Sequence, residues 1–152
     1  HVDIFPWNTF VFDGKAADPE QECLAFEAKI RAVGVVDLWL LGLGTNGHIA
    51  FNEPGSDPTS RSRVVTPDAE TAEANSRHFA DPAEVPTEAL TAGVSTILDG
   101  RQIVLVALGA HKADAVARAI EGNRSPDCPA SLLQGHADCT FLLDRAAASQ
   151  LS

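Results

Sequence analysis

Methionine is absent from this 152-residue sequence, cysteine is scarce, and no long apolar run is present. The three cysteines, Cys23, Cys128 and Cys139, are odd in number and widely spaced, so the sequence predicts neither a disulfide framework nor a zinc site. Free thiols are typical of a reducing compartment, and we therefore expect a cytoplasmic protein. No stretch approaches the length of a membrane span, and no charged-then-apolar leader opens the chain. The sequence therefore predicts neither a membrane protein nor a secreted one.

Positive charge is also scarce. The 11 lysines and arginines are outnumbered by 21 aspartates and glutamates, which gives a formal net charge of −10. Nucleic acids and anionic membrane surfaces both require a basic face, so this balance argues against either partner. An anionic metabolite can still bind where a few cations are local. The hydrophobic content of 45% is enough for one globular domain with a sizeable core.

The most informative stretch begins with an apolar run at residues 35–41, bounded by Gly34 and Gly42. The run is too short for most helices, and its nearly continuous apolar character predicts a strand covered on both faces. Gly42 and Gly44 remove side chains where the strand ends, so the backbone can turn sharply or lie close to a bound molecule. In open α/β sheets, this end of a strand is the ligand-binding edge.

Four polar side chains crowd into the loop after this strand. Asn46, His48, Asn52 and Glu53 place an imidazole, a carboxylate and two amides within eight residues. A single histidine on a loop is usually solvated or hydrogen-bonded for structural reasons, and a GLG sequence alone is a weak turn signal. The whole group in a strand-to-loop context favours a functional site.

The rest of the chain alternates helix and strand patterns. The sequence predicts an amphipathic helix at 19–33, a short strand at 63–65, a helix at 68–77, a buried strand at 102–108, a helix that includes Lys112 in its first turn and runs up to Gly122, a short helix at 129–135 and a strand at 139–143. Residues 1–17 are expected to form a loop, and residues 90–98 fit either a helix or a strand followed by a helix. Because strands alternate with helices and no hairpin signal is present, we expect an α/β fold with a mostly parallel sheet and helices on both faces.

Two cations stand near the expected ends of these elements. Lys112 falls in the first turn of the helix after the second buried strand, where free backbone N–H groups and the helix dipole favour an anion. Phosphate binding and a solvent-facing lysine both remain open there. Arg77 is an isolated arginine, which by itself is normally a solvated surface charge. The GLGTNG segment lacks the full glycine fingerprint of a dinucleotide site, so such a site is not expected.

The segment GLGTNGHIAFNEPGS, residues 42–56, closely resembles the signature of the glucosamine-6-phosphate deaminases. This family converts glucosamine 6-phosphate and water to fructose 6-phosphate and ammonia. The related 6-phosphogluconolactonases carry a similar glycine-histidine element but then diverge, whereas residues 48–54 are similar to the deaminase version. The similarity continues through Arg77 and Lys112 to about Asp144. It implies the Rossmann-like fold that these deaminases share with ribose-phosphate isomerases.

The resemblance implies a role for each candidate residue. His48 matches the family's ring-opening acid–base group, and Glu53 and Asn46 match residues that orient or tune it. Arg77 matches an arginine that clamps the sugar phosphate, and Lys112 matches a phosphate-contacting lysine. The glycines expected at the substrate are Gly42, Gly44 and Gly47. The implied ligand is a phosphorylated amino sugar, and neither a metal nor an organic cofactor is implied.

One position departs from the common form of the motif, which has aspartate where this chain has Asn46. A neutral amide can orient an imidazole, but it cannot stabilise an imidazolium as a carboxylate does. Two alternatives to the deaminase remain open: a catalytically inactive sugar-phosphate-binding regulator, and a lactonase-like hydrolase. A regulator needs only the phosphate ligands, so the presence of both His48 and Glu53 favours an enzyme.

The chain begins at His1 and contains no methionine, and we expect it to be the C-terminal part of a larger deaminase domain, spanning residues 1–152 as a single unit. The resemblance implies that about the first two fifths of the family's length precede it. That part would include a glycine- and threonine-rich phosphate loop and an aspartate that moves the C2 proton of the sugar. The fold is then incomplete, and the fragment alone is expected to be inactive. A homo-oligomer is also consistent with the family, many of whose bacterial members are hexamers.

Overall fold

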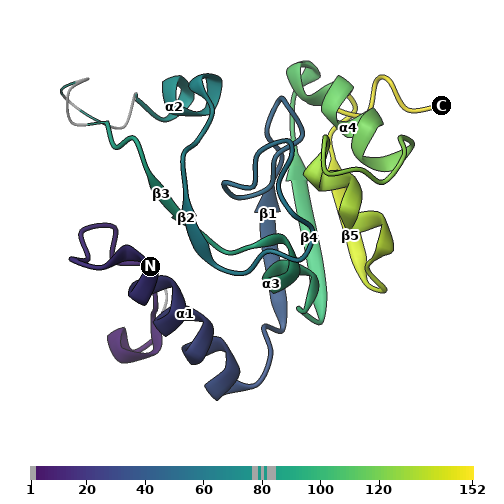
Figure 1. The fold of residues 1–152 in the computed structure, drawn as a ribbon. Coiled ribbons are helices and arrows are strands. Elements are labelled where there is room, and N and C mark those ends of the chain that lie inside the picture. Colours follow the sequence, from purple (N-terminus) through teal and green to yellow (C-terminus); the bar gives the residue numbers. More distant parts are fainter. Residues whose placement is uncertain (1–2, 77–78, 80, 82–84) are drawn as a thin grey trace.

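The computed structural model describes residues 3–76, 79, 81 and 85–152. In chain order the α-helices (α), 3-10 helices (η) and strands (β) are η1 (Pro6–Asn8), α1 (Pro19–Val33), β1 (Leu38–Gly42), β2 (Arg63–Val65), α2 (Ala69–Ser76), β3 (Ala89–Thr91), α3 (Val94–Leu98), β4 (Gln102–Ala107), η3 (Ala110–Lys112), α4 (Ala113–Ile120), η4 (Pro129–Gly135) and β5 (Cys139–Leu143). Figure 1 shows their arrangement. None of the helices among the described residues is long and apolar enough to cross a membrane.

A parallel three-stranded sheet with the order β1-β4-β5 forms the centre of the fold. Gly42 at the end of β1 pairs with Val106 of β4, and Ala107 of β4 pairs with Leu143 of β5. The three carboxyl ends therefore meet at one edge of the sheet, as expected for parallel strands joined by helical crossovers. The predicted α/β fold, with a parallel sheet flanked by helices, is confirmed (Figure 1).

One face of this sheet carries the hydrophobic core. Ile103 and Leu105 of β4 are fully buried there, and they cluster with Ile97 of α3, Val116 of α4 and Leu133 of η4. Since side chains alternate along a strand, their neighbours in sequence point to the opposite face. Burial of the core face removes the apolar side chains of all three helical segments from water, which fixes how they lie on the sheet.

The opposite face keeps apolar side chains at the surface. Leu38 and Leu40 of β1 are 50% and 68% exposed, and Leu142 of β5 is 57% exposed. The prediction that residues 35–41 form a strand covered on both faces is therefore wrong on one face. The strand also begins at Leu38 rather than at residue 35.

A second, two-stranded sheet was not foreseen. Strands β2 and β3 pair antiparallel, with Arg63 opposite Thr91, although no hairpin signal marks the sequence. The connection between them carries α2, so the pair is not a tight hairpin. We call the described residues between 63 and 91, namely 63–76, 79, 81 and 85–91, the arm (Figure 1). It lies beside α1, whose buried Glu27 accepts hydrogen bonds from Ser62 just before the arm and from Thr96 beyond its end.

Most predicted elements lie where the sequence places them. Helix α1 has the predicted bounds, with the side chain of Asp18 accepting from the backbone N–H of Gln21 at 3.0 Å. The open segment 90–98 is the end of a strand followed by a helix. Lys112 belongs to the 3-10 turn before α4 rather than to the first turn of that helix.

Candidate active site

The loop after β1 is shaped by its own backbone. We call residues 43–55 the signature loop. The backbone N–H of Gly44 donates to the carbonyl of His48 at 2.9 Å, and that of Gly47 donates back to the carbonyl of Gly44 at 3.0 Å. The ring of His48 lies so close to Gly44 that a Cβ there would come within 2.2 Å of Nδ1. Gly47 has φ of +93°, and a Cβ there would lie 2.7 Å from the sulfur of Cys128.

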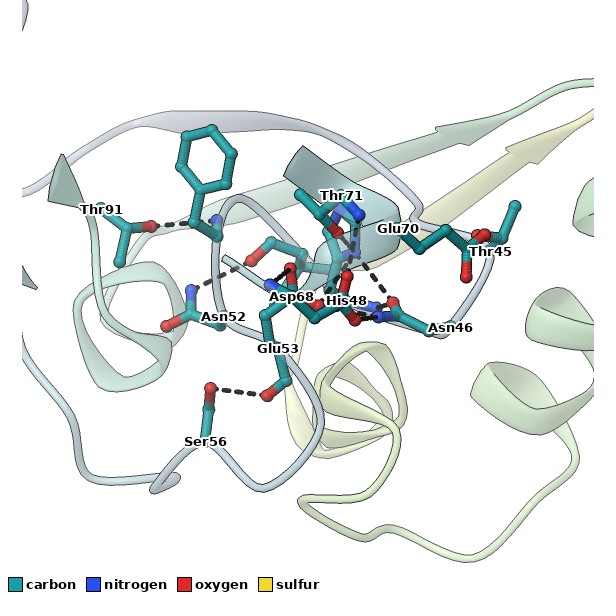
Figure 2. Close-up of polar contacts among 12 residues, drawn as sticks. Thr45, Asn46, His48, Asn52, Glu53, Ser56, Asp68, Glu70, Thr71 and Thr91 are labelled. Atoms are coloured by element: carbon teal, nitrogen blue, oxygen red, sulfur yellow. Dashed lines mark hydrogen bonds and ion pairs between the residues drawn. The ribbon is translucent and has the colours of Figure 1, made fainter. Parts of the chain in front are cut away.

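Three residues of the signature loop form one hydrogen-bonded cluster (Figure 2). Nδ1 of His48 lies 2.8 Å from Oδ1 of Asn46 and 3.4 Å from Oε2 of Glu53. The backbone N–H of His48 donates to the same Oδ1 at 3.0 Å. The amide nitrogen of Asn46 donates to Oε2 of Glu53 at 2.7 Å. The residues to which the resemblance assigns acid–base work are therefore together in the structure.

The arm contributes a second set of groups to this cluster. Oδ2 of Asp68 accepts a hydrogen bond from the amide nitrogen of Asn46 at 2.6 Å, and Oγ1 of Thr71 lies 3.4 Å from Nδ1 of His48 (Figure 2). Asp68 also caps α2, because its Oδ1 accepts from the backbone N–H of Thr71 at 2.8 Å. That backbone donor, with further help from the side chains of Thr71 and Asn46, lowers the pKa of Asp68.

Asn52 anchors the signature loop to the arm. Its side chain is fully buried and donates to the carbonyls of Ile49 at 3.0 Å and Ala92 at 2.9 Å. Its carbonyl oxygen accepts from the guanidinium of Arg63 at 2.8 Å. Between these contacts Ala50 adopts a left-handed conformation with φ of 51°, which a non-glycine residue keeps only where its surroundings determine it.

A cavity of about 560 Å³ opens beside His48 at the carboxyl edge of the sheet. Gly42 and Gly44 line it from the strand end, Glu70 from α2, and Lys112 from η3. Burial lowers the pKa of Lys112, and the nearby carboxylate of Glu70 opposes this effect. The cavity therefore holds an imidazole and a partly buried ammonium group, which suits a polar ligand with an anionic end.

Helix α4 braces the signature loop from the other side. The guanidinium of Arg118 donates to the carbonyls of Asn46 at 3.2 Å and Thr45 at 3.3 Å. The same side chain pairs with Asp114 one turn earlier. Backbone carbonyls in a turn need such donors when water has limited access. The loop is thus held by α4, by the arm and by its own glycines.

The structure brings most of the predicted site residues together. Gly42, Gly44, His48 and Lys112 share the cavity, and Asn46 and Glu53 contact His48. Gly47 instead packs against Cys128, where its missing side chain makes room for the sulfur. Arg77 lies outside the described residues.

Asp68, Glu70 and Thr71 are not among the site residues predicted from the sequence. Asp68 is the first residue of the helix predicted at 68–77, and aspartate is common where a helix begins. Their proximity to His48 depends on the path of the arm, which comes back to the signature loop more than 20 residues later. No local pattern encodes that return.

Comparison with known proteins places this geometry in a family. The model of the family described as glucosamine-6-phosphate isomerases/6-phosphogluconolactonase matches residues 1–142. The chain belongs to this family. Glucosamine-6-phosphate deaminase 1 of Bacillus subtilis is 47% identical over 149 residues, which are 98% of this chain and 62% of that protein. The deaminase of Shewanella loihica is 48% identical over 151 residues, 99% of this chain and 56% of that protein.

Solved structures of the glucosamine-6-phosphate isomerase/6-phosphogluconolactonase family give the same picture. A monomeric glucosamine-6-phosphate deaminase superimposes with a TM-score of 0.94 at 47% identity, covering 98% of this chain and 62% of that one. The 6-phosphogluconolactonase of Trypanosoma cruzi superimposes with a TM-score of 0.65 at 25% identity, covering 88% of this chain and 52% of that one. The chain spans just over half the length of the curated relatives it matches.

Proposed function

We propose that this chain carries the ring-opening and phosphate-binding part of a glucosamine-6-phosphate deaminase. The observation that carries the proposal is the position of His48, whose ring lies in a cavity with Lys112 and contacts Asn46 and Glu53. A sugar phosphate needs both an acid–base group and an anion-binding cation in one site. The names of relatives at 46% to 48% identity support the same activity.

The first chemical step suits an imidazole. Opening the pyranose ring requires that one proton leave the hydroxyl at C1 and that another reach the ring oxygen. An imidazole accepts and returns protons near neutral pH, so His48 can perform both transfers if Asn46 and Glu53 hold its ring.

Isomerisation and deamination follow ring opening. A proton moves from C2 to C1, which leaves an imine at C2, and addition of water then releases ammonia and gives the ketose. These steps need no change of oxidation state at a cofactor. The resemblance implies that the base for the C2 proton lies outside this chain.

The phosphate is proposed to bind at Lys112, with Arg77 as a second ligand. Lys112 is partly buried in the cavity, where attraction between opposite charges is stronger than in bulk water. We also propose a cytoplasmic location, which the three free cysteines support.

An ammonia-release assay tests the proposal. The full-length polypeptide that contains this chain is offered glucosamine 6-phosphate, unphosphorylated glucosamine or a sugar-phosphate lactone. We expect ammonia and fructose 6-phosphate from the first substrate and much slower turnover of the second. Hydrolysis of the lactone without ammonia release would replace the deaminase by a lactonase, and binding without turnover would indicate a regulator.

A further inference from the structure

The amide of Asn46 can adopt only one of its two orientations in this site. One end of the amide lies 2.7 Å from Oε2 of Glu53 and 2.6 Å from Oδ2 of Asp68. Ionised carboxylates only accept hydrogen bonds, so the NH₂ group must face them. The reverse orientation would place a carbonyl oxygen against two carboxylate oxygens. The carbonyl of Asn46 therefore faces His48 (Figure 2).

This orientation determines which ring nitrogen of His48 carries the proton. Oδ1 of Asn46 can only accept, and it lies 2.8 Å from Nδ1. In the neutral imidazole, Nδ1 must then be the N–H donor, and Nε2 keeps its lone pair. Within the described part of the chain, Nε2 has no hydrogen-bond partner, so it is available to a ligand in the cavity that His48 lines.

Asp68 also explains why position 46 is an amide. If an aspartate replaced Asn46, a carboxylate oxygen would stand 2.6 Å from Asp68 and 2.7 Å from Glu53. Three carboxylates so close together repel, and one would be forced to bind a proton. The amide of Asn46 donates hydrogen bonds to Asp68 and Glu53 and accepts one from the imidazole. It therefore links the two carboxylates to His48 without adding a negative charge.

We propose that Asp68 is a positioning residue which acts through Asn46 to fix the proton of His48 on Nδ1 and to leave Nε2 as the base for the sugar. The catalytic use of that base rests on the proposed function, whereas the tautomer does not. The structural alternative is that Asp68 serves only as the N-cap of α2, through its bond to Thr71.

The Asp68→Ser variant separates the two roles. Serine caps a helix about as well as aspartate, but its side chain is too short to reach Asn46. In the full-length protein we expect kcat to fall about tenfold with KM changed less than about twofold, the scale seen for groups that orient a catalytic ligand. Asp18→Ser is the matched control, because Asp18 caps α1 in the same way and no contact among the described residues links it to the cluster.

A double-mutant cycle tests the coupling between positions 46 and 68. Asn46→Asp alone should lower kcat strongly, whereas Asn46→Asp combined with Asp68→Ser should lose about tenfold less than the product of the two single effects. Independent effects of the two substitutions would contradict the proposal.

Nitrogen NMR of protein with isotope-labelled histidines identifies the tautomer of His48, and the measurement does not require enzymatic activity. The full-length wild-type protein should show the Nδ1-protonated form of the neutral His48 ring, identified by the signals lost in His48→Gln. Asp68→Ser should populate the Nε2-protonated form, and Asp18→Ser should not. An unchanged tautomer in Asp68→Ser overturns the proposal even if the enzyme is active, whereas absence of ammonia release by the wild type overturns only the proposed function. If Asp68→Ser does not fold, the spectrum of Asp68→Thr decides, because threonine also caps a helix and is too short to reach Asn46.

Discussion

The signature loop and the arm build the candidate site in different ways. The loop fixes its own shape through short backbone hydrogen bonds around Gly44 and through the fully buried side chains of Ile49 and Asn52. The arm has strands of only three residues and reaches the loop through polar side chains such as Asp68. The comparison indicates that His48, the proposed acid–base group, is placed by local structure, while Asp68 and Thr71 approach it from a distant part of the chain.

The hydrogen bonds of the loop and those between loop and arm also differ in how much they stabilise the protein. Buried hydrogen bonds such as those of Asn52 are costly to break, because the partners left behind are cut off from water. Contacts between exposed polar side chains are worth much less. Changes at the loop centre should therefore have large effects, and changes at the exposed loop–arm contacts should have small ones.

The largest effect is expected for His48→Gln in the full-length protein. Glutamine keeps a polar side chain but cannot exchange protons near neutral pH, so turnover of the cyclic sugar should fall by about a hundredfold or more. His136→Gln is the matched control, because His136 contacts the carbonyl of Gly100 rather than the cavity. Steady-state ammonia release measures both variants. Turnover within a few-fold of wild type in His48→Gln would remove this residue from the mechanism.

The next largest effect, on stability, is expected at Glu27 of α1, which contacts the residues that flank the arm. Glu27 is 5% exposed and accepts hydrogen bonds from Ser62 and Thr96. Burial alone raises the pKa of Glu27, but these hydrogen bonds outweigh it and the pKa is lowered. Glu27→Gln should lower the free energy of unfolding by about 2 kcal/mol at neutral pH, because bonds to a charged acceptor are lost.

The stabilisation by Glu27 should depend on pH with a defined sign. A carboxyl group whose pKa is lower in the folded state stabilises the protein above its unfolded pKa, about 4.3, and less as pH falls through the folded value. The difference in the free energy of unfolding between wild type and Glu27→Gln, measured by urea unfolding, should therefore become smaller below about pH 4. Glu20→Gln on the exposed side of α1 is the control. A difference in the free energy of unfolding that grows in acid would contradict the role of the ionised carboxylate.

The sequence predicted the loop far better than the arm. The glycines, His48 and Glu53 lie within one short stretch, so their proximity follows from the chain itself. Asp68 reaches Asn46 only because the arm leaves the sheet and returns, and a three-residue antiparallel pair gives almost no periodic signal. The exposed Leu40 shows a second limit, since an apolar run reports that a strand can be buried but not what covers it.

Lys112 should have a selective effect on ligand binding. Lys112→Met keeps the length of the side chain but removes the ammonium group from the cavity, so affinity for phosphorylated ligands should fall about tenfold or more. Affinity for unphosphorylated glucosamine should change little, and Lys15→Met serves as a control outside the cavity. Calorimetric titration of the full-length protein measures these affinities. Equal losses for the two ligands would show that Lys112 does not recognise phosphate, and Arg77→Met extends the same test to the second proposed ligand.

The smallest effect is expected where loop and arm meet at the surface. Oγ1 of Thr45 donates to Oε1 of Glu70 at 2.5 Å, and this contact is exposed. Thr45→Val removes the bond but leaves the carbonyl of Thr45 as an acceptor for Arg118, so the loop backbone keeps its brace. The free energy of unfolding should change by less than about 0.5 kcal/mol, and kcat by about twofold at most. Denaturant unfolding and ammonia release check the two values. A tenfold loss of kcat without loss of stability would mean that the arm positions the loop through Glu70 rather than through Asp68, and that exposed contacts of the arm matter as much as the buried contacts of the loop.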